Sequence, residues 1–327
     1  MILRLSLILI FLIVLTGVAT WFVAPREPAD LTVTFDPAAI GSDPDTYLAR
    51  TEADVPNLRP ADAKEIVWAY PASRAKTPLA VIYLHGFSAS KEELRPLPDE
   101  VAKALGANLF LTRLSGHGRD GVALARTNVN EWINDLAEAI AIGRTIGERV
   151  IVVANSTGGT LATLGAAQPG VMDGVAGLVL LSPNYALSDR YAFLLDWPFA
   201  RDFGPWLIGE ERSFAPVNDA QAAHWTTRYP TAALLPLGAL LRETRAVDVR
   251  KMTIPAFFLY SPVDRVVDAG VTETVAARWG APHAVLQVPV SGDPLNHVLA
   301  GRILSPATTD ELAGRIGEWV KATTTAK

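Results

Sequence analysis

The stretch VIVVANSTGG, residues 150–159, sets four apolar residues shortly before a serine and two glycines. It continues into TLATLGAA, whose apolar residues recur at helical spacing. A strand that turns at once into a helix through a serine is close to the G-x-S-x-G elbow, a strained turn that holds the serine side chain over the end of a sheet. Ala154 stands where that elbow has its first glycine.

The elbow predicts a nucleophile at Ser156. A serine hydroxyl attacks a carbonyl only when a base takes its proton and N–H donors hold the negative charge that forms on the oxygen. The N–H of Thr157, at the start of the helix, is expected to be one of those donors. Gly158 and Gly159 suit a tight turn whose helix packs close to the sheet. The alternative is that Ser156 only caps the helix, which short motifs of this kind also fit.

Short apolar runs alternate with helical patterns from about Lys64 onward. Several runs are apolar throughout, as in the strands of a parallel sheet that is covered on both faces. The alternation predicts an α/β fold with an open, mostly parallel sheet and helices on both sides. The runs are residues 65–70, 79–86, 107–113, 149–155, 177–183, 255–261 and 283–290, and the helical patterns are 130–147, 160–168 and 308–322.

Two polar residues follow later strands at the edge where the serine is expected. Asp264 lies just beyond the run PAFFLYS, and His297 lies in the loop after the last run. Open α/β sheets bind their ligands outside the carboxyl ends of the strands. The chain order Ser, Asp, His predicts Asp264 as the acid and His297 as the base of a triad. Both also fit ordinary roles, since loop aspartates commonly form turns and loop histidines are commonly exposed.

The stretch LHGF, residues 84–87, ends an early apolar run. A backbone N–H in the loop after such a strand can supply the second oxyanion donor, and the N–H of Phe87 is the predicted one. His85 is not expected to be the base, because the base should follow the last strand.

A long segment between Ser182 and Pro255 interrupts the alternation and is rich in aromatic residues. A plain crossover helix needs far fewer residues, so residues 186–250 are predicted to form an inserted cap, or lid, over one end of the sheet. The core would then comprise residues 64–185 and 251–327. The aromatic residues favour an apolar pocket wall, although they also fit a small core within the cap itself.

The N-terminal residues 5–24 carry no charge and are mostly Leu, Ile, Val and Phe. A helix of about 20 such residues can cross the hydrocarbon core of a bilayer, so residues 1–25 predict a transmembrane anchor. A cleaved signal peptide is the alternative, with Gly17 and Ala19 near a processing site. Arg4 precedes the span, which places the globular part on the non-cytoplasmic side, anchored or secreted. Residues 26–63, rich in Pro, Asp and Ala, are predicted to form an extended tether.

The composition argues against several other classes of protein. The net charge of the 327 residues is −5, so the basic footprint of a nucleic-acid binder is absent. The chain has no cysteine, which excludes disulfides and thiolate metal sites. A nucleotide-binding enzyme is the nearest rival, but ANSTGG lacks the glycine spacing of the dinucleotide and P-loop motifs.

Five motifs together resemble the α/β-hydrolase superfamily, and within it the monoacylglycerol-lipase and lysophospholipase-like carboxylesterases. They are LHGF, RLSGHGRDG, NSTGG, SPVDRVV and the Asn-His pair at 296–297, and the resemblance covers roughly residues 64–322. It implies Ser156 as nucleophile, Asp264 as acid, His297 as base, and Phe87 and Thr157 as oxyanion donors. His117, in the GHG at 116–118, is not a triad member in that family. Ala154 and Asn155 depart from the family pattern at the turn.

These features predict a serine hydrolase that cleaves a lipid-like or apolar carboxylic ester through an acyl-enzyme, with no metal and no organic cofactor. The expected partners are a small ester substrate and, through the N-terminal helix, a membrane, but no nucleic acid. Peptidase and acyltransferase activities use the same groups. A membrane-tethered binding protein without catalysis also shares the fold.

Overall fold

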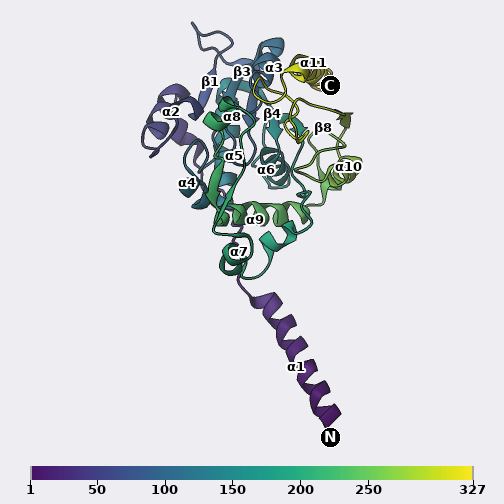
Figure 1. Ribbon diagram of the computed structural model, residues 1–327. Helices are drawn as coiled ribbons and strands as arrows, with labels where there is room; N and C mark the ends of the chain where they lie inside the picture. Colours follow the sequence, from purple (N-terminus) through teal and green to yellow (C-terminus); the bar gives the residue numbers. More distant parts are fainter. Residues whose placement is uncertain (1, 326–327) are drawn as a thin grey trace.

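A central sheet of seven strands organises the body of the protein (Figure 1). The computed structural model describes residues 2–325, apart from the side chains of residues 2–3 and 19–22. The strand order is β1-β3-β2-β4-β5-β8-β9, and all neighbours are parallel except β1 and β3. The strands are β1 (Glu65–Val67), β2 (Thr77–Leu84), β3 (Asn108–Leu111), β4 (Gly147–Asn155), β5 (Val175–Leu181), β8 (Ala256–Tyr260) and β9 (His283–Gln287).

The predicted mostly parallel sheet is confirmed, and each of the seven apolar runs overlaps one of its strands. The central strands β2, β4, β5 and β8 are buried over nearly their whole length, which is why their sequences are continuously apolar. Strand β1 is the exception in direction. It is a short, half-buried edge strand, and its sequence alone does not reveal its antiparallel pairing.

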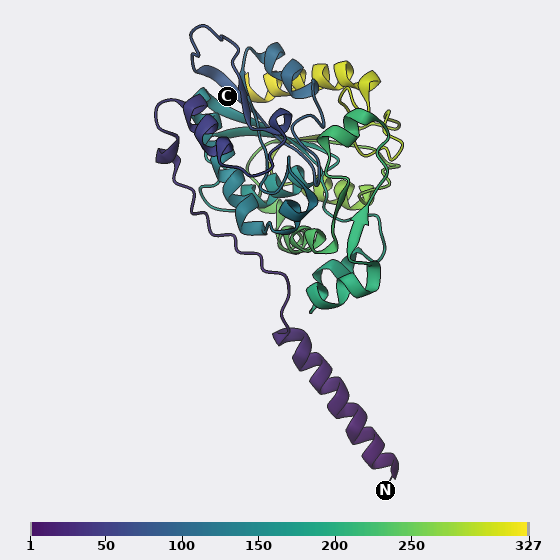
Figure 2. The same cartoon turned by 60° about the vertical axis from the view of Figure 1, so that its left-hand side comes forward.

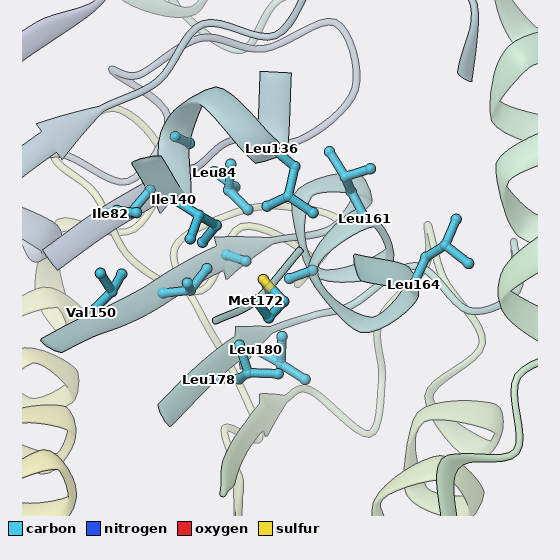
Figure 3. Packing of buried hydrophobic residues seen from close by; sticks show 14 of the residues in the cluster. Ile82, Leu84, Leu136, Ile140, Val150, Leu161, Leu164, Met172, Leu178 and Leu180 are labelled. Carbon is cyan, nitrogen blue, oxygen red and sulfur yellow. The ribbon is translucent and has the colours of Figure 1, made fainter. Parts of the chain in front are cut away.

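Helices cover both faces of the sheet. Because successive side chains point to opposite faces, Ile82 and Leu84 of β2 pack into one apolar core, and Val81 and Tyr83 pack into the other. The first core lies under α5 (Val129–Ile146), α6 (Thr157–Ala166), α9 (Leu234–Arg245) and α10 (Ala269–Ala277). Figure 3 shows part of it, with side chains of α5 and α6 against β2, β4 and β5. The second core lies under α3 (Leu97–Leu105) and α11 (Pro306–Thr325).

The segment predicted as an inserted cap, residues 186–250, contains mostly short elements. Its last helix, α9, contributes Ala239 and Leu240 to the core of the sheet. The role of the segment as a cap stays a prediction, as do the other predicted domain limits. The remaining elements are the 3-10 helices η3 (Ala192–Asp196) and η4 (Thr231–Ala233), helices α7 (Ala200–Ile208) and α8 (Asp219–His224), the strand pair β6 (Glu211–Ser213) and β7 (Arg228–Pro230), and η5 (Val249–Lys251).

Residues 26–63 are only partly the extended tether that was predicted. The structure has η1 (Pro37–Ile40), α2 (Pro44–Ala53) and η2 (Pro60–Asp62) there, and Tyr47 and Leu48 are buried in the first core. Helix α2 begins because the Asp43 carboxylate accepts hydrogen bonds from the Asp45 and Thr46 N–H groups, while Pro44 fits the first helical position. Asp43 and Pro44, which were among the residues that predicted a tether, therefore begin a helix.

The chain before η1 is extended, but it is fastened to the body. Asn134 of α5 accepts hydrogen bonds from the N–H groups of Thr34 and Phe35, and its amide donates to the carbonyl of Thr32. Nearer the N-terminus, Glu27 forms a bidentate ion pair with Arg201 of α7. We call residues 24–36 the strap, because they connect α1 to both α5 and the inserted segment.

Helix α1 (Ile2–Val23) projects from the body on the side where α7 lies (Figure 1 and Figure 2). Among the described residues, no helix is both long enough and apolar enough to cross a membrane. The predicted transmembrane anchor and membrane partner are therefore not supported: the uncharged run predicted a helix and a span, and only the helix is found. Residue 1 and the side chains of 19–22 lie outside the described residues. The non-cytoplasmic location stays a prediction.

The hydrogen bonds of Asn134 predict the effect of its removal. In Asn134→Ala, water replaces the lost partners of the exposed strap, so the free energy of unfolding should fall by only about 1 kcal/mol. The strap itself should open more often, and limited proteolysis within residues 30–36 should become several-fold faster. Thr145→Ala, also on α5 but with its hydroxyl bonded to the carbonyl of Ala141 within the helix, is the control. Equal cleavage rates in both variants would contradict this role of Asn134.

The remaining short helix of the body, α4 (Gly121–Ala125), packs beneath the inserted segment. A Cβ atom at Gly121 would lie 2.3 Å from the carbonyl oxygen of Arg228, so a glycine is required for this approach. In the same part of the inserted segment, Thr226 donates hydrogen bonds to the carbonyls of Ser88 and Arg119, in the loops after β2 and β3.

Candidate active site

The turn between β4 and α6 has the geometry of a strained elbow. Ser156 has φ 50° and ψ −117°, a backbone conformation that residues other than glycine seldom adopt. A Cβ atom at Gly158 would lie 2.4 Å from the carbonyl oxygen of Leu84, and one at Gly159 would lie 2.9 Å from Cβ of Pro183. The helix therefore approaches the end of β2 as closely as the sequence predicted. Ala154 is fully buried in β4 and takes the place of a glycine there.

The structure brings Ser156, Asp264 and His297 together. His297 Nε2 lies 2.9 Å from the hydroxyl oxygen of Ser156, and His297 Nδ1 lies 2.8 Å from Oδ2 of Asp264. All three side chains are buried or nearly so. The other carboxylate oxygen of Asp264 accepts hydrogen bonds from the N–H groups of Val266 and Val267, which fixes its orientation.

The charge around His297 favours a protonated imidazole. Burial lowers the pKa of His297, but the hydrogen bond and charge of Asp264 outweigh it, and the carboxylates of Glu93 and Asp293 act in the same direction. The pKa of His297 is therefore raised above its ordinary value of 6.5. A base with this environment accepts a proton readily from a neighbouring hydroxyl.

His85 lies close by but is held in a different state. Its Nδ1–H donates to the carbonyl of Gly86, and its Nε2 accepts the N–H of Leu114. Burial lowers the pKa of His85 to about 4, so the ring is neutral and serves to join two loops. This agrees with the expectation that His85 is not the base.

The residues of the two predicted oxyanion donors both lie near Ser156. Thr157 is the first residue of α6, where N–H groups have no acceptor within the helix. Phe87 follows Gly86, and a Cβ atom at Gly86 would lie 3.2 Å from Cβ of Ser156. The ring of Phe87 packs edge-on against Tyr229 of the inserted segment, at 5.4 Å between ring centres. Their role as donors belongs to the proposal below.

The GHG loop, residues 116–118, packs against the loop that carries His85 and Phe87. Gly116 and Gly118 have positive φ angles, and His117 between them is buried with its ring 4.9 Å from that of His85. Burial lowers the pKa of His117 far below its ordinary value, so it is neutral. His117 makes no contact with the Ser156 hydroxyl or with Asp264 in the described structure, and it packs instead against Phe87 and Trp132.

Two buried carboxylates at this site were missed by the sequence reasoning. Asp293 accepts hydrogen bonds from the N–H groups of Leu295, His297 and Val298, so it shapes the loop that carries the imidazole. The signal was present in DPLNH, since an aspartate often bonds the backbone a few residues later. Glu93 lies behind the loop of Phe87, and its surroundings in KEEL look like an ordinary charged surface run.

Comparisons with known proteins show the family of this chain. The model of the alpha/beta hydrolase family matches residues 81–302. A thermostable monoacylglycerol lipase of Bacillus sp. (strain H-257) is 30% identical over 200 residues, which are 61% of this chain and 75% of that protein. The chain therefore belongs to the alpha/beta hydrolase family and is a hydrolase.

Solved structures share the fold at low identity. A structure from work on the metagenome-derived lipolytic enzymes LipS and LipT has a TM-score of 0.63 at 19% identity, covering 81% of this chain and 99% of that one. A soluble variant of monoglyceride lipase from Saccharomyces cerevisiae has a TM-score of 0.60 at 12% identity, covering 80% and 91%. At such identity these likenesses show the α/β-hydrolase fold and nothing finer.

The pKa of His297 can be measured directly by NMR titration of its imidazole. We expect a value above 6.5 in the wild type and a lower value in Asp264→Asn, because the carboxylate stabilises the protonated ring. His85 is an internal control that should stay neutral near pH 6 in both proteins. If the pKa of His297 were unchanged by the substitution, the pairing of these two side chains would be disproved.

Proposed function

We propose that this chain is a serine hydrolase of carboxylic esters. Ser156 is the nucleophile, His297 the general base, Asp264 the group that orients and stabilises the imidazole, and the N–H groups of Phe87 and Thr157 are the oxyanion donors. The observation that carries the proposal is the line of contacts from Asp264 through His297 to Ser156, at 2.8 and 2.9 Å, at the end of the parallel strands.

The first half of the reaction forms an acyl-enzyme. As the hydroxyl oxygen of Ser156 attacks the ester carbonyl, His297 Nε2 takes the hydroxyl proton, and Asp264 holds the proton on Nδ1 and stabilises the imidazolium. The carbonyl oxygen becomes negative and is held by the two N–H groups. His297 then gives its proton to the leaving alcohol. The elbow favours this step because it presents the hydroxyl at the rim of the sheet without a change in backbone conformation.

Water completes the cycle by the same route. His297 takes a proton from water as the water oxygen attacks the acyl carbon, and then returns that proton to Ser156 as the acid leaves. Peptidase and acyltransferase reactions use these same groups, with an amide in place of the ester or an acceptor in place of water.

Two observations favour an apolar, lipid-like acyl group. The curated relative named above is called a monoacylglycerol lipase. In addition, a cavity of about 160 Å³ between η3, α7 and α9 has an apolar lining that includes Leu194, Phe203 and Leu235. Leu187 also lines it and pairs with Val267, in the segment that holds the carboxylate of Asp264. In this proposal, residues 186–250 act as the cap over the site.

A fluorophosphonate probe tests the nucleophile. The probe should label the wild type, and Ser156→Ala should lose the label together with ester hydrolysis, by a factor on the order of 10⁶. Ser73→Ala, at an exposed loop position, is the matched control and should label normally. Labelling of Ser156→Ala, or no labelling of the wild type, would contradict the proposal. The second result would favour a binding protein without catalysis.

A substitution in the cavity tests the acyl group. Gly204 lines the cavity, and the nearest atom to a Cβ added there is 4.0 Å away, so Gly204→Leu should fold and fill the space. We expect kcat/KM for a decanoyl ester to fall about tenfold or more, with little change for an acetyl ester. Gly314→Leu, at an open position on α11, is the control. Equal effects of Gly204→Leu on both esters would contradict the assignment of this cavity.

A further inference from the structure

A third carboxylate lies behind the loop of Phe87, and the proposed mechanism does not use it. Glu93 is only 3% exposed, and it has no cationic side chain within ion-pair distance in the described part of the chain. Its neighbour Glu92 is also buried, but Glu92 pairs with Arg95 and Arg302. Burying a carboxylate without a cation destabilises the folded state, and an apolar side chain in the same space would destabilise it less. The position therefore calls for a functional explanation.

The contacts of Glu93 are directed at the oxyanion loop. Its Oε2 accepts the N–H of Gly86 at 2.7 Å and the hydroxyl of Tyr83 at 2.9 Å. A Cβ atom at Gly86 would lie 2.8 Å from Oε1 of Glu93 and 3.2 Å from Cβ of Ser156. Gly86 is thus enclosed between this carboxylate and the nucleophile. The peptide that carries the Phe87 N–H is the next one along the chain.

The same stretch also supports the loop of His297. A Cβ atom at Gly301 would lie 2.5 Å from the backbone oxygen of Glu93, so the two backbones touch. Nearby, the N–H of Arg302 donates to the carbonyl of Arg95 at 2.9 Å. Glu93 therefore lies between the loop of the predicted oxyanion donor and the loop of the predicted base.

We propose that Glu93 is a positioning residue for the reaction proposed above, on which this inference rests. Its carboxylate fixes the loop at residues 85–88 through the N–H of Gly86, so that the N–H of Phe87 is held toward the carbonyl oxygen of the substrate. Its negative charge also stabilises the imidazolium that forms on His297 during catalysis.

The titration of these groups agrees with the geometry. Burial raises the pKa of Glu93, whereas the N–H of Gly86, the hydroxyl of Tyr83 and the charge of His297 oppose that rise. In turn, the acidic groups that raise the pKa of His297 are Asp264, Glu93 and Asp293. Removal of the charge at Glu93 should therefore lower the pKa of His297, and the acidic limb of kcat/KM should move to lower pH.

Two substitutions separate the two parts of this role. Glu93→Gln keeps an oxygen that can accept the Gly86 N–H but loses the charge, so kcat should fall about tenfold, and the acidic limb should move to lower pH. Glu93→Leu removes the acceptor as well, so kcat should fall by about 100-fold, as expected when an oxyanion donor is no longer held. KM should stay within about threefold of the wild-type value in both, because neither change touches the acyl site.

Glu92→Gln is the matched control. It changes an adjacent buried carboxylate whose partners are arginines, so it should alter thermal stability without shifting the acidic limb. If Glu93→Leu does not fold, Glu93→Gln still gives both readouts. Wild-type kcat and an unmoved acidic limb in folded Glu93→Gln would overturn the inference. Failure of the proposed function would appear differently, as a wild-type protein whose Ser156 is not labelled by a fluorophosphonate.

Discussion

The imidazole of His297 joins chain segments that are 141 and 33 residues away in sequence, and the site depends on that single bridge. Its two ring nitrogens are distinct, so the contact with Asp264 decides which of them faces Ser156 as a proton acceptor. Hydrogen bonds with backbone N–H groups hold both Asp264 and His297 in place. Asp264 is held by two backbone N–H groups, and the His297 loop is held by Asp293. The fold therefore supplies alignment before any substrate arrives.

Such alignment costs stability at specific positions. Ser156 is held at positive φ without being a glycine, and Glu93 and Asp293 are buried carboxylates. Strained backbone and buried charge persist only where the surrounding structure enforces them, and they cluster at functional sites. Here the enforcing structure is the first apolar core, which packs α6 against β2 and β4 (Figure 3).

Much of the fold could be predicted from the sequence, because the strands of a covered parallel sheet are continuously apolar. The location of Ser156, Asp264 and His297 at strand ends followed from the same pattern. The direction of β1 and the start of α2 did not follow, since the first depends on pairing with β3 and the second on one carboxylate at Asp43. The burial of Glu93 could not be predicted, because a charged run in the sequence does not indicate which of its side chains points into the protein.

The uncharged N-terminal run is a case in which the structure supports only part of the prediction. It predicted both a helix and a membrane span, and only the helix α1 is found among the described residues. A pattern of residue types is informative where packing sets it, as in β4.

The central claim is that the alignment of these side chains makes the hydroxyl of Ser156 a covalent nucleophile. The direct measurement is acid quenching during turnover of an ester with slow deacylation, followed by mass spectrometry of the digested protein. The account predicts an acyl adduct on the peptide that contains Ser156, formed in the wild type and not detected in His297→Ala on the same timescale. Ester hydrolysis with no adduct at Ser156 would contradict it.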